Sequence, residues 1–206
     1  TFLHVGCGLD HKSELIGFNN SDWKEIRFDI DELVNPDIVG TLLDMSQVQT
    51  ASVDAVYSSH NIEHVYPHEV PIVLKEFLRV LNNNGIVVIE CPDLQSICEA
   101  VIQDKLYDPL YVSDVGPIAP IDILYGLRGA LQDGNEYMAH NCGFTYSTLL
   151  NFFIDAGFKE MIRRFAADAA ATATPLRIFE MGLGTGLNAF MTYLECLKLP
   201  PEQQFP

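Results

Sequence analysis

The stretch Phe2–Gly8, FLHVGCG, decides how the rest of the chain is interpreted. An apolar run that suits a buried strand leads directly into two glycines, Gly6 and Gly8. Glycine has no Cβ and adopts φ angles that other residues avoid, so a turn built on it can approach a ligand closely. The stretch predicts the first strand of a nucleotide-binding sheet, with a ligand turn at its carboxyl end. A tight turn without a ligand is the alternative at this point.

Short apolar runs alternate with helical patterns over most of the chain. Residues Val70 to Leu81 repeat apolar side chains at three- and four-residue steps, which predicts a helix, and Asn82–Gly85 (NNNG) is expected to end it in a left-handed cap. This alternation predicts an α/β fold with a doubly wound, mostly parallel, Rossmann-like sheet. The expected strands are Phe2–Val5, Glu25–Ile30, Asp37–Thr41, Val53–Tyr57 and Ile86–Glu90.

The composition limits what the chain can bind. With 206 residues, 48% hydrophobic and 19% charged, it is long enough for one elaborated domain. Its formal net charge of −16 repels phosphate backbones, so nucleic acid is not expected as a partner. No apolar run approaches the roughly 18 residues that span a bilayer, so no membrane partner is expected. Five scattered cysteines without a C-x-x-C pair argue against a disulfide framework or a zinc site, and fit the cytoplasm.

Acidic residues follow the next two predicted strands. The segment RFDID places Asp29 and Asp31 about twenty residues after the glycine turn, where a carboxylate can accept both hydroxyl hydrogens of a ribose. The segment GTLLDM ends in Asp44 and Met45, and Asp44 could meet the exocyclic amine of an adenine. Carboxylates that only mark solvated strand ends are the alternative. The fourth strand then continues into VDAVYSSHNIEHV, residues 53–65.

Six motifs in this order and spacing resemble the class I S-adenosylmethionine-dependent methyltransferases. They are LHVGCG, RFDID, GTLLDM, VDAVYSSHNIEHV, LKEFLRVLNNNGIVVIECPDL and LLNFFIDAGF. The resemblance covers roughly Thr1 to Arg164 and is closest to small bacterial enzymes described as predicted methyltransferases. It implies S-adenosylmethionine as the cofactor and a class I methyltransferase type of Rossmann-like sheet.

The resemblance also implies a role for particular residues. Gly6 and Gly8 would border the methionine part of the cofactor, and Asp31 or Asp29 would hold its ribose. Asp44 with Met45 would bracket the adenine. The inner side of the cofactor would be lined by Ser58, Ser59 and His60. One departure is that LDHKSELIGFNNSDW, which follows the glycine turn, lacks the usual full helix.

The histidines need a separate interpretation. His60, His64 and His68 recur every four residues, a spacing that can suit a metal ion, but the EH pair belongs to the methyltransferase resemblance and no metal is predicted. His140, which leads out of the predicted lid, and His60 are the candidates for a catalytic base. Whether transfer needs a base is left open. Trp23 is expected near the cofactor site.

Three regions are expected along the chain. Residues 1–165 form the methyltransferase domain, with a proline-rich insertion at about 94–142 that acts as a substrate lid. Thr145–Ala156 is expected to be a helix capped by Thr145 or Ser147, and Phe158–Arg164 a strand. Residues 166–206 form an atypical extension, which could supply a last strand and a helix.

The extension carries a second glycine turn in FEMGLGTGLNAF, residues 179–190. Glu180 and the glycines after it resemble the first motif of the methyltransferases that act on the aminomethyl-thiouridine of tRNA. About twenty residues remain after the turn, too few for a second ribose-binding strand. No second cofactor site is therefore expected; a truncated fusion would leave the same trace.

The sequence as a whole predicts methyl transfer by in-line displacement. The acceptor, a small molecule or one of unknown class, is not identified by the sequence. A nicotinamide-dependent oxidoreductase is the first alternative, although His11 stands where the third glycine of G-x-G-x-x-G belongs. A non-catalytic binding module with the same fold is the second. The oligomeric state is left open.

Overall fold

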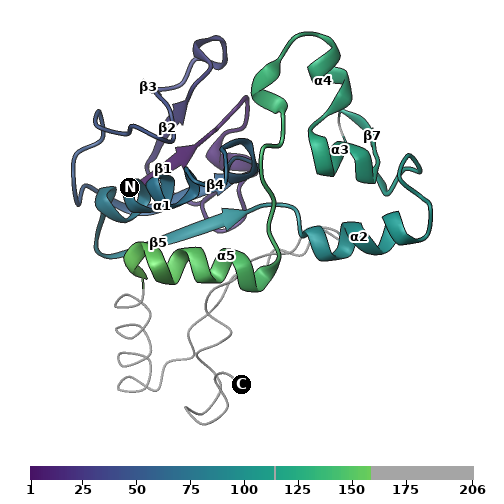
Figure 1. Cartoon of the computed structure of the whole chain (residues 1–206). Coiled ribbons are helices and arrows are strands. Elements are labelled where there is room, and N and C mark those ends of the chain that lie inside the picture. The colour runs from purple at the N-terminus through teal and green to yellow at the C-terminus, as the bar shows by residue number, and fades with distance from the viewer. Residues whose placement is uncertain (114, 159–206) are drawn as a thin grey trace.

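A five-stranded parallel sheet forms the centre of the protein (Figure 1). The computed structural model describes residues 1–113 and 115–158. The strand order is β3-β2-β1-β4-β5, and each neighbouring pair is parallel. This order confirms the predicted doubly wound α/β fold. The strands are β1 (Phe2–Val5), β2 (Glu25–Asp29), β3 (Ile38–Val39), β4 (Val53–Ser59) and β5 (Leu81–Glu90).

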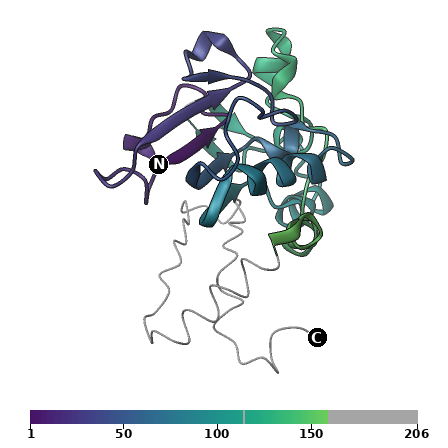
Figure 2. The same ribbon diagram turned by 90° about the vertical axis from the view of Figure 1, so that its left-hand side faces the viewer.

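The two faces of the sheet bury different sets of side chains, because successive residues of a strand point to opposite sides. On one face, Leu3 and Val5 pack in the main core with Phe77 of α1 (Val70–Val80) and Phe153 of α5 (Tyr146–Phe153). Figures 1 and 2 show α5, coloured green, below the sheet. The other face holds a smaller aromatic cluster, made of Phe2, Leu15, Phe18, Ala55 and Tyr57.

The connection from β1 to β2 contains no α-helix. Its only regular element is the three-residue 3-10 helix η1 (Lys12–Glu14), which agrees with the departure seen in the sequence. Trp23 packs against Phe18, with ring centroids 5.0 Å apart, and against Phe2 at 6.0 Å. Phe2 begins β1, so Trp23 lies at the end of the strand opposite the glycine turn. The expectation of a tryptophan beside the cofactor site is wrong.

The NNNG segment does not form a left-handed helix cap. Helix α1 ends at Val80, and its C-cap residue Leu81 is already extended. The reason is that Leu81 is buried and pairs with Val53, which draws the chain directly into β5. The next pairing is Ala55 with Ile86, so residues 82–85 bulge out of the ladder. A local stop signal is overridden here by strand pairing.

The segment between β5 and α5 is more regular than its prolines suggested. It lies beyond the carboxyl end of β5 (Figure 1). It encloses a small core of Ile97, Ile118 and Ile123. Asp122 holds this unit together because it accepts hydrogen bonds from the Ala119 amide and from the Arg128 guanidinium. Its elements are α2 (Leu94–Ile102), β6 (Tyr111–Ser113), β7 (Gly116–Ile118), α3 (Pro120–Tyr125), α4 (Arg128–Gln132) and the 3-10 helix η4 (Glu136–Met138).

Helix α5 begins where the sequence predicted it. Thr145 is the N-cap residue, and its amide donates a 2.9 Å hydrogen bond to the hydroxyl of Thr148. The helix runs into one π-helical turn, η5 (Ile154–Phe158), in which Gly157 has φ 110°. Most of the predicted strand Phe158–Arg164, and the whole extension 166–206 with its glycine turn, lie outside the described residues. Across the described segments, no helix is both long and apolar enough to cross a membrane.

Candidate functional site

A cavity of about 430 Å³ opens at the carboxyl ends of β1, β2 and β4. Ligands of doubly wound sheets bind at this edge, and the volume lies within the roughly 300–1,000 Å³ usual for small-molecule sites. The cavity is lined by residues of the glycine turn, the ends of β2 and β3, the segment after β4 and the 3-10 helix η4. They include Gly6, Gly8, Asp29, Asp31, Leu42, Leu43, His60, Asn61, His64, Tyr66, Glu69, Glu136, Tyr137, Met138 and Asn141.

The two glycines of the turn have different surroundings. Both have positive φ, 58° for Gly6 and 51° for Gly8. A Cβ at Gly6 would collide with the side chain of Asn61, whose Nδ2 donates to the carbonyls of Val5 and Ser59 at 3.0 and 2.7 Å. A Cβ at Gly8 would meet nothing within 4 Å. The space beside the Gly6 Cα is therefore filled by the side chain of Asn61, whereas the space beside the Gly8 Cα is open.

Asp29 and Asp31 both line the cavity but have different partners. Asp29 is buried, and its two oxygens accept hydrogen bonds from the amides of Gly8 (2.8 Å) and Asp31 (2.9 Å). Asp31 is half-buried, and its Oδ1 accepts the amide of Leu33 at 2.9 Å. Asp29 thus holds the glycine turn against the end of β2, while the second oxygen of Asp31 has no partner among the described residues.

The loop after β3 reaches the cavity with the two residues that precede Asp44 and Met45, the pair predicted to bracket the adenine. Leu42 and Leu43 line the cavity, but Asp44 and Met45 do not. Met45 is fully buried, and Asp44 is exposed, with its carboxylate accepting the Ser46 amide. The Met45 backbone is fixed by helix α1, where Glu76 accepts its amide and Arg79 donates to its carbonyl. These contacts hold the loop in place.

The serines at the end of β4 also lie outside the cavity lining. Ser58 is buried, and its hydroxyl has no partner in the part of the chain that the structure describes. The Ser59 hydroxyl donates to Glu90 at 3.0 Å. His60, the next residue, does line the cavity, and its φ of 51° turns the chain toward it.

His60 pairs with a buried carboxylate. Its Nδ1 lies 3.2 Å from Oε1 of Glu63; the His60 side chain is 45% exposed and that of Glu63 only 2%. Burial alone would lower the pKa of His60, but the hydrogen bond and the charges of Glu63 and Glu90 raise it. Burial would likewise raise the pKa of Glu63, but His60 and His64 outweigh that effect and lower it. The pair is a hydrogen-bonded histidine–carboxylate dyad beside the cavity.

His140 lies behind the cavity lining. Its Nδ1 is 2.7 Å from the carbonyl oxygen of Ile123, and its ring packs edge-on against His64, with centroids 4.9 Å apart. Burial lowers the pKa of His140. Of the two predicted bases, the structure therefore brings only His60 to the cavity.

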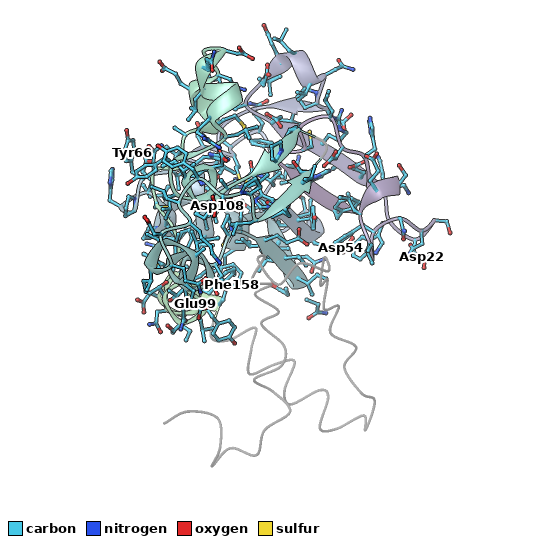
Figure 3. All side chains as sticks on the ribbon, turned by 90° about the vertical axis from the view of Figure 1, so that its right-hand side faces the viewer. Asp22, Asp54, Tyr66, Glu99, Asp108 and Phe158 are labelled. Carbon is cyan, nitrogen blue, oxygen red and sulfur yellow. The ribbon has the colours of Figure 1, made fainter. Side chains whose placement is uncertain are left out.

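Several lining residues were not proposed as site residues from the sequence: Asn61, Tyr66 and the η4 residues Glu136, Tyr137 and Met138. Tyr66 follows the strand-end motif, and Figure 3 shows it on the opposite side of the molecule from Asp54 and Asp22. Among the described residues that line the cavity there are four carboxylates and no lysine or arginine. The carboxylates are Asp29, Asp31, Glu69 and Glu136.

The comparison with protein families identifies the class of this fold. Residues 3–89 match the model of the methyltransferase domain. This span runs from β1 to the end of β5 and includes the glycine turn, both strand-end aspartates and His60. The parallel sheet is Rossmann-like, of the class I methyltransferase type.

Solved structures with a similar fold are distant in sequence. A methyltransferase dependent on S-adenosylmethionine from Archaeoglobus fulgidus is 18% identical, with a TM-score of 0.49, over 76% of this chain and 59% of that one. One from Mesorhizobium loti is 17% identical over 76% and 72%, with a TM-score of 0.46. A Pyrococcus horikoshii protein is 22% identical over 50% and 53%, with a TM-score of 0.42. The chain thus spans little more than half of the first and last of these proteins. No curated protein matches it.

Proposed function

We propose that this protein is an S-adenosylmethionine-dependent methyltransferase whose cofactor and acceptor share the cavity at the carboxyl edge of the sheet. The observation that carries the proposal is the charge of the lining, four carboxylates without a basic residue among the described ones. S-Adenosylmethionine bears a sulfonium and an ammonium group, which an acidic cavity attracts. The pyrophosphate of a nicotinamide cofactor would be repelled by the same groups.

The residues around the glycine turn suit the proposed cofactor. Gly8 borders open space, so the cofactor can lie against its backbone. Asp31 offers an unpaired carboxylate oxygen for ribose hydroxyls, and Leu42 with Leu43 offers apolar surface for a base. In this proposal Asp44 and Met45 act by holding that loop, Asp29 by holding the turn, and Ser58 and Ser59 by ending β4 beneath His60.

When bound, the cofactor supplies an activated methyl group, so the protein has mainly to align the acceptor. Alignment of the two reactants can lower the free-energy barrier of the reaction by several kcal/mol. His60 is the proposed proton acceptor. If its Nδ1 carries the hydrogen that Glu63 accepts, Nε2 is left with a lone pair for a proton of the acceptor. A positioned base of this kind contributes about 10²–10⁴-fold to a rate. His140, outside the lining, is the weaker candidate.

The proposed acceptor is a small neutral or cationic molecule, such as an amine. Glu69 and Glu136 are both in the cavity lining and would attract a cation, and Tyr137 and Met138 of η4 would provide apolar contact. We infer that the insertion at about 94–142 serves as the lid of the domain 1–165, because η4 is the part of it that closes the wall.

Calorimetric titration tests this function directly. We expect S-adenosylhomocysteine to bind at one per chain and NADH not to bind. Binding of NADH without S-adenosylhomocysteine would make the protein a nicotinamide enzyme instead. In an assay with an amine that the enzyme methylates, His60→Gln should lower kcat about 10²-fold or more. The affinity for S-adenosylhomocysteine should be unchanged. His68→Gln, an exposed neighbour, is the matched control.

A further inference from the structure

We propose that Glu63, His64 and His140 form a binding site for a divalent transition-metal ion. One ligand atom from each residue lies within 4.8 Å of the other two. Glu63 and His64 belong to the 3-10 helix η3 (Ile62–His64) after β4, whereas His140 follows η4 in the segment that returns from the lid. In the sequence only the spacing of His60, His64 and His68 was considered for a metal ion, and no metal was predicted there.

Glu63 provides an oxygen that lacks a partner. The residue is 1% exposed, and its Oε1 is paired with His60. Its Oε2 is buried and has no hydrogen-bond partner among the described residues. An unpaired buried carboxylate oxygen costs several kcal/mol, so such atoms are normally hydrogen-bonded or coordinated to a cation. A metal ion would satisfy this oxygen without displacing His60 from the other.

The two histidines are oriented as metal ligands usually are. His64 Nδ1 lies 3.0 Å from the carbonyl oxygen of Ala139, and His140 Nδ1 lies 2.7 Å from that of Ile123. A carbonyl oxygen only accepts, so each Nδ1 carries the hydrogen, which leaves Nε2 as the ring nitrogen that can bind a metal ion. Metal-ligating histidines are held in this tautomer by carbonyl or carboxylate partners on the other ring nitrogen.

The backbone holds the two segments together at this place. The amides of Asn141 and Cys142 both donate to the carbonyl of Glu63, at 2.8 and 3.1 Å, and Asn141 Nδ2 donates to that of His64. Metal bonds of about 2.0–2.2 Å require ligand atoms roughly 3.3 Å apart, so the three side chains need to close by about 1.5 Å at most. Side-chain rotation supplies such a movement while the backbone stays fixed.

The ligand types select the ion. Two imidazoles and one carboxylate suit zinc and neighbouring first-row ions, whereas magnesium and calcium prefer oxygen ligands alone. The nearby thiol of Cys142 donates to the carbonyl of Ile62. Because His64 also lines the cavity, the ion would lie in the cavity wall. It would link η3 to the segment after η4 that carries His140.

Zinc titration of the full chain, in competition with a chromophoric chelator, tests the site. To remove adventitious thiolate binding, Cys98, which is exposed, is replaced by serine in every variant. We expect one zinc ion per chain. His64→Asn and His140→Asn should each weaken binding at least about a hundredfold, since even the loss of an outer-shell partner costs 10–100-fold. His68→Asn should bind zinc as tightly as the parent, the chain that carries only Cys98→Ser.

Two further measurements keep the test decisive if a variant is unstable. Zinc at a hundredfold excess over its dissociation constant should raise Tm by about 5–10 °C in the parent and in His68→Asn, but not in His140→Asn. Cobalt bound to the parent should show d–d bands without a thiolate charge-transfer band. Absence of stoichiometric binding in the parent, or unchanged binding in a folded His64→Asn/His140→Asn double variant, would overturn the site. Neither result depends on methyl transfer.

Discussion

The side chain of Asn61 occupies the space in which a Cβ of Gly6 would lie. From that position its amide group bridges the ends of β1 and β4 by donating to the carbonyls of Val5 and Ser59. The first glycine of the turn is therefore required by a residue more than fifty positions away. Its neighbour Gly8, which borders open space, is free of this constraint.

Gly6→Ala should destabilise the protein by about 2–5 kcal/mol, because a positive φ and a steric collision with Asn61 both oppose it. Gly8→Ala carries only the cost of its positive φ, about 1–2 kcal/mol, and should instead weaken binding of S-adenosylhomocysteine. Urea unfolding and calorimetry separate the two effects. In the Gly6→Ala/Asn61→Ala double variant, part of the loss should be recovered. Strict additivity would show that no collision occurs.

Asp31→Ala should weaken cofactor binding by about tenfold to a hundredfold and leave the free energy of unfolding nearly unchanged, because its carboxylate holds only the Leu33 amide. Asp29→Ala should also destabilise the protein, by about 1–3 kcal/mol, because two backbone amides lose their acceptor. Calorimetry and urea unfolding of both variants provide the comparison. An affinity loss with Asp29→Ala alone would reassign the ribose contact.

Asp122→Asn should destabilise the lid by about 1.5–3 kcal/mol at pH 7, because Asp122 is a buried acceptor for the Ala119 amide and for Arg128. Burial raises the pKa of Asp122, but Arg128 and the two amides outweigh it and lower the pKa in the folded protein. The stabilisation is therefore complete above the unfolded pKa of about 4 and is lost as the pH falls through the lower folded value.

The expected signature is a difference in unfolding free energy between wild type and Asp122→Asn that stays constant from about pH 7 to pH 5 and shrinks below pH 4. Asp108→Asn, at an exposed position labelled in Figure 3, is the matched control. A difference that persists unchanged at low pH would mean that packing, rather than the charge, stabilises the lid.

Replacement of Gly184 and Gly186 by valine should leave the stoichiometry of S-adenosylhomocysteine at one per chain, since the proposed cofactor site is the cavity at Gly6 and Gly8. Deletion of residues 175–206 should lower stability without abolishing binding, because Leu187, Phe190 and Leu194 repeat at helical spacing and are worth roughly 1.5–3 kcal/mol each if buried. A wild-type stoichiometry of two would establish a second site.

The strands and the glycine turn were predictable because their signals are local. A short apolar run followed by glycine, such as Phe2–Val5, favours a buried strand, and the repeat from Val70 to Val80 places one face of a helix on the core. Thr145 was likewise recognisable as a cap from its position just before the apolar repeat. The parallel order followed from the alternation of these elements.

Contacts between distant segments were decided only by the tertiary structure. The left-handed stop expected at Asn82–Gly85 gave way to strand pairing between Leu81 and Val53, because burial of Leu81 outweighs a local turn preference. His140 met Glu63 and His64 because the lid returns beside η3, a juxtaposition across more than seventy residues that no spacing encodes. Periodicity reports which side of an element is buried, but which side chains then meet depends on the path of the whole chain.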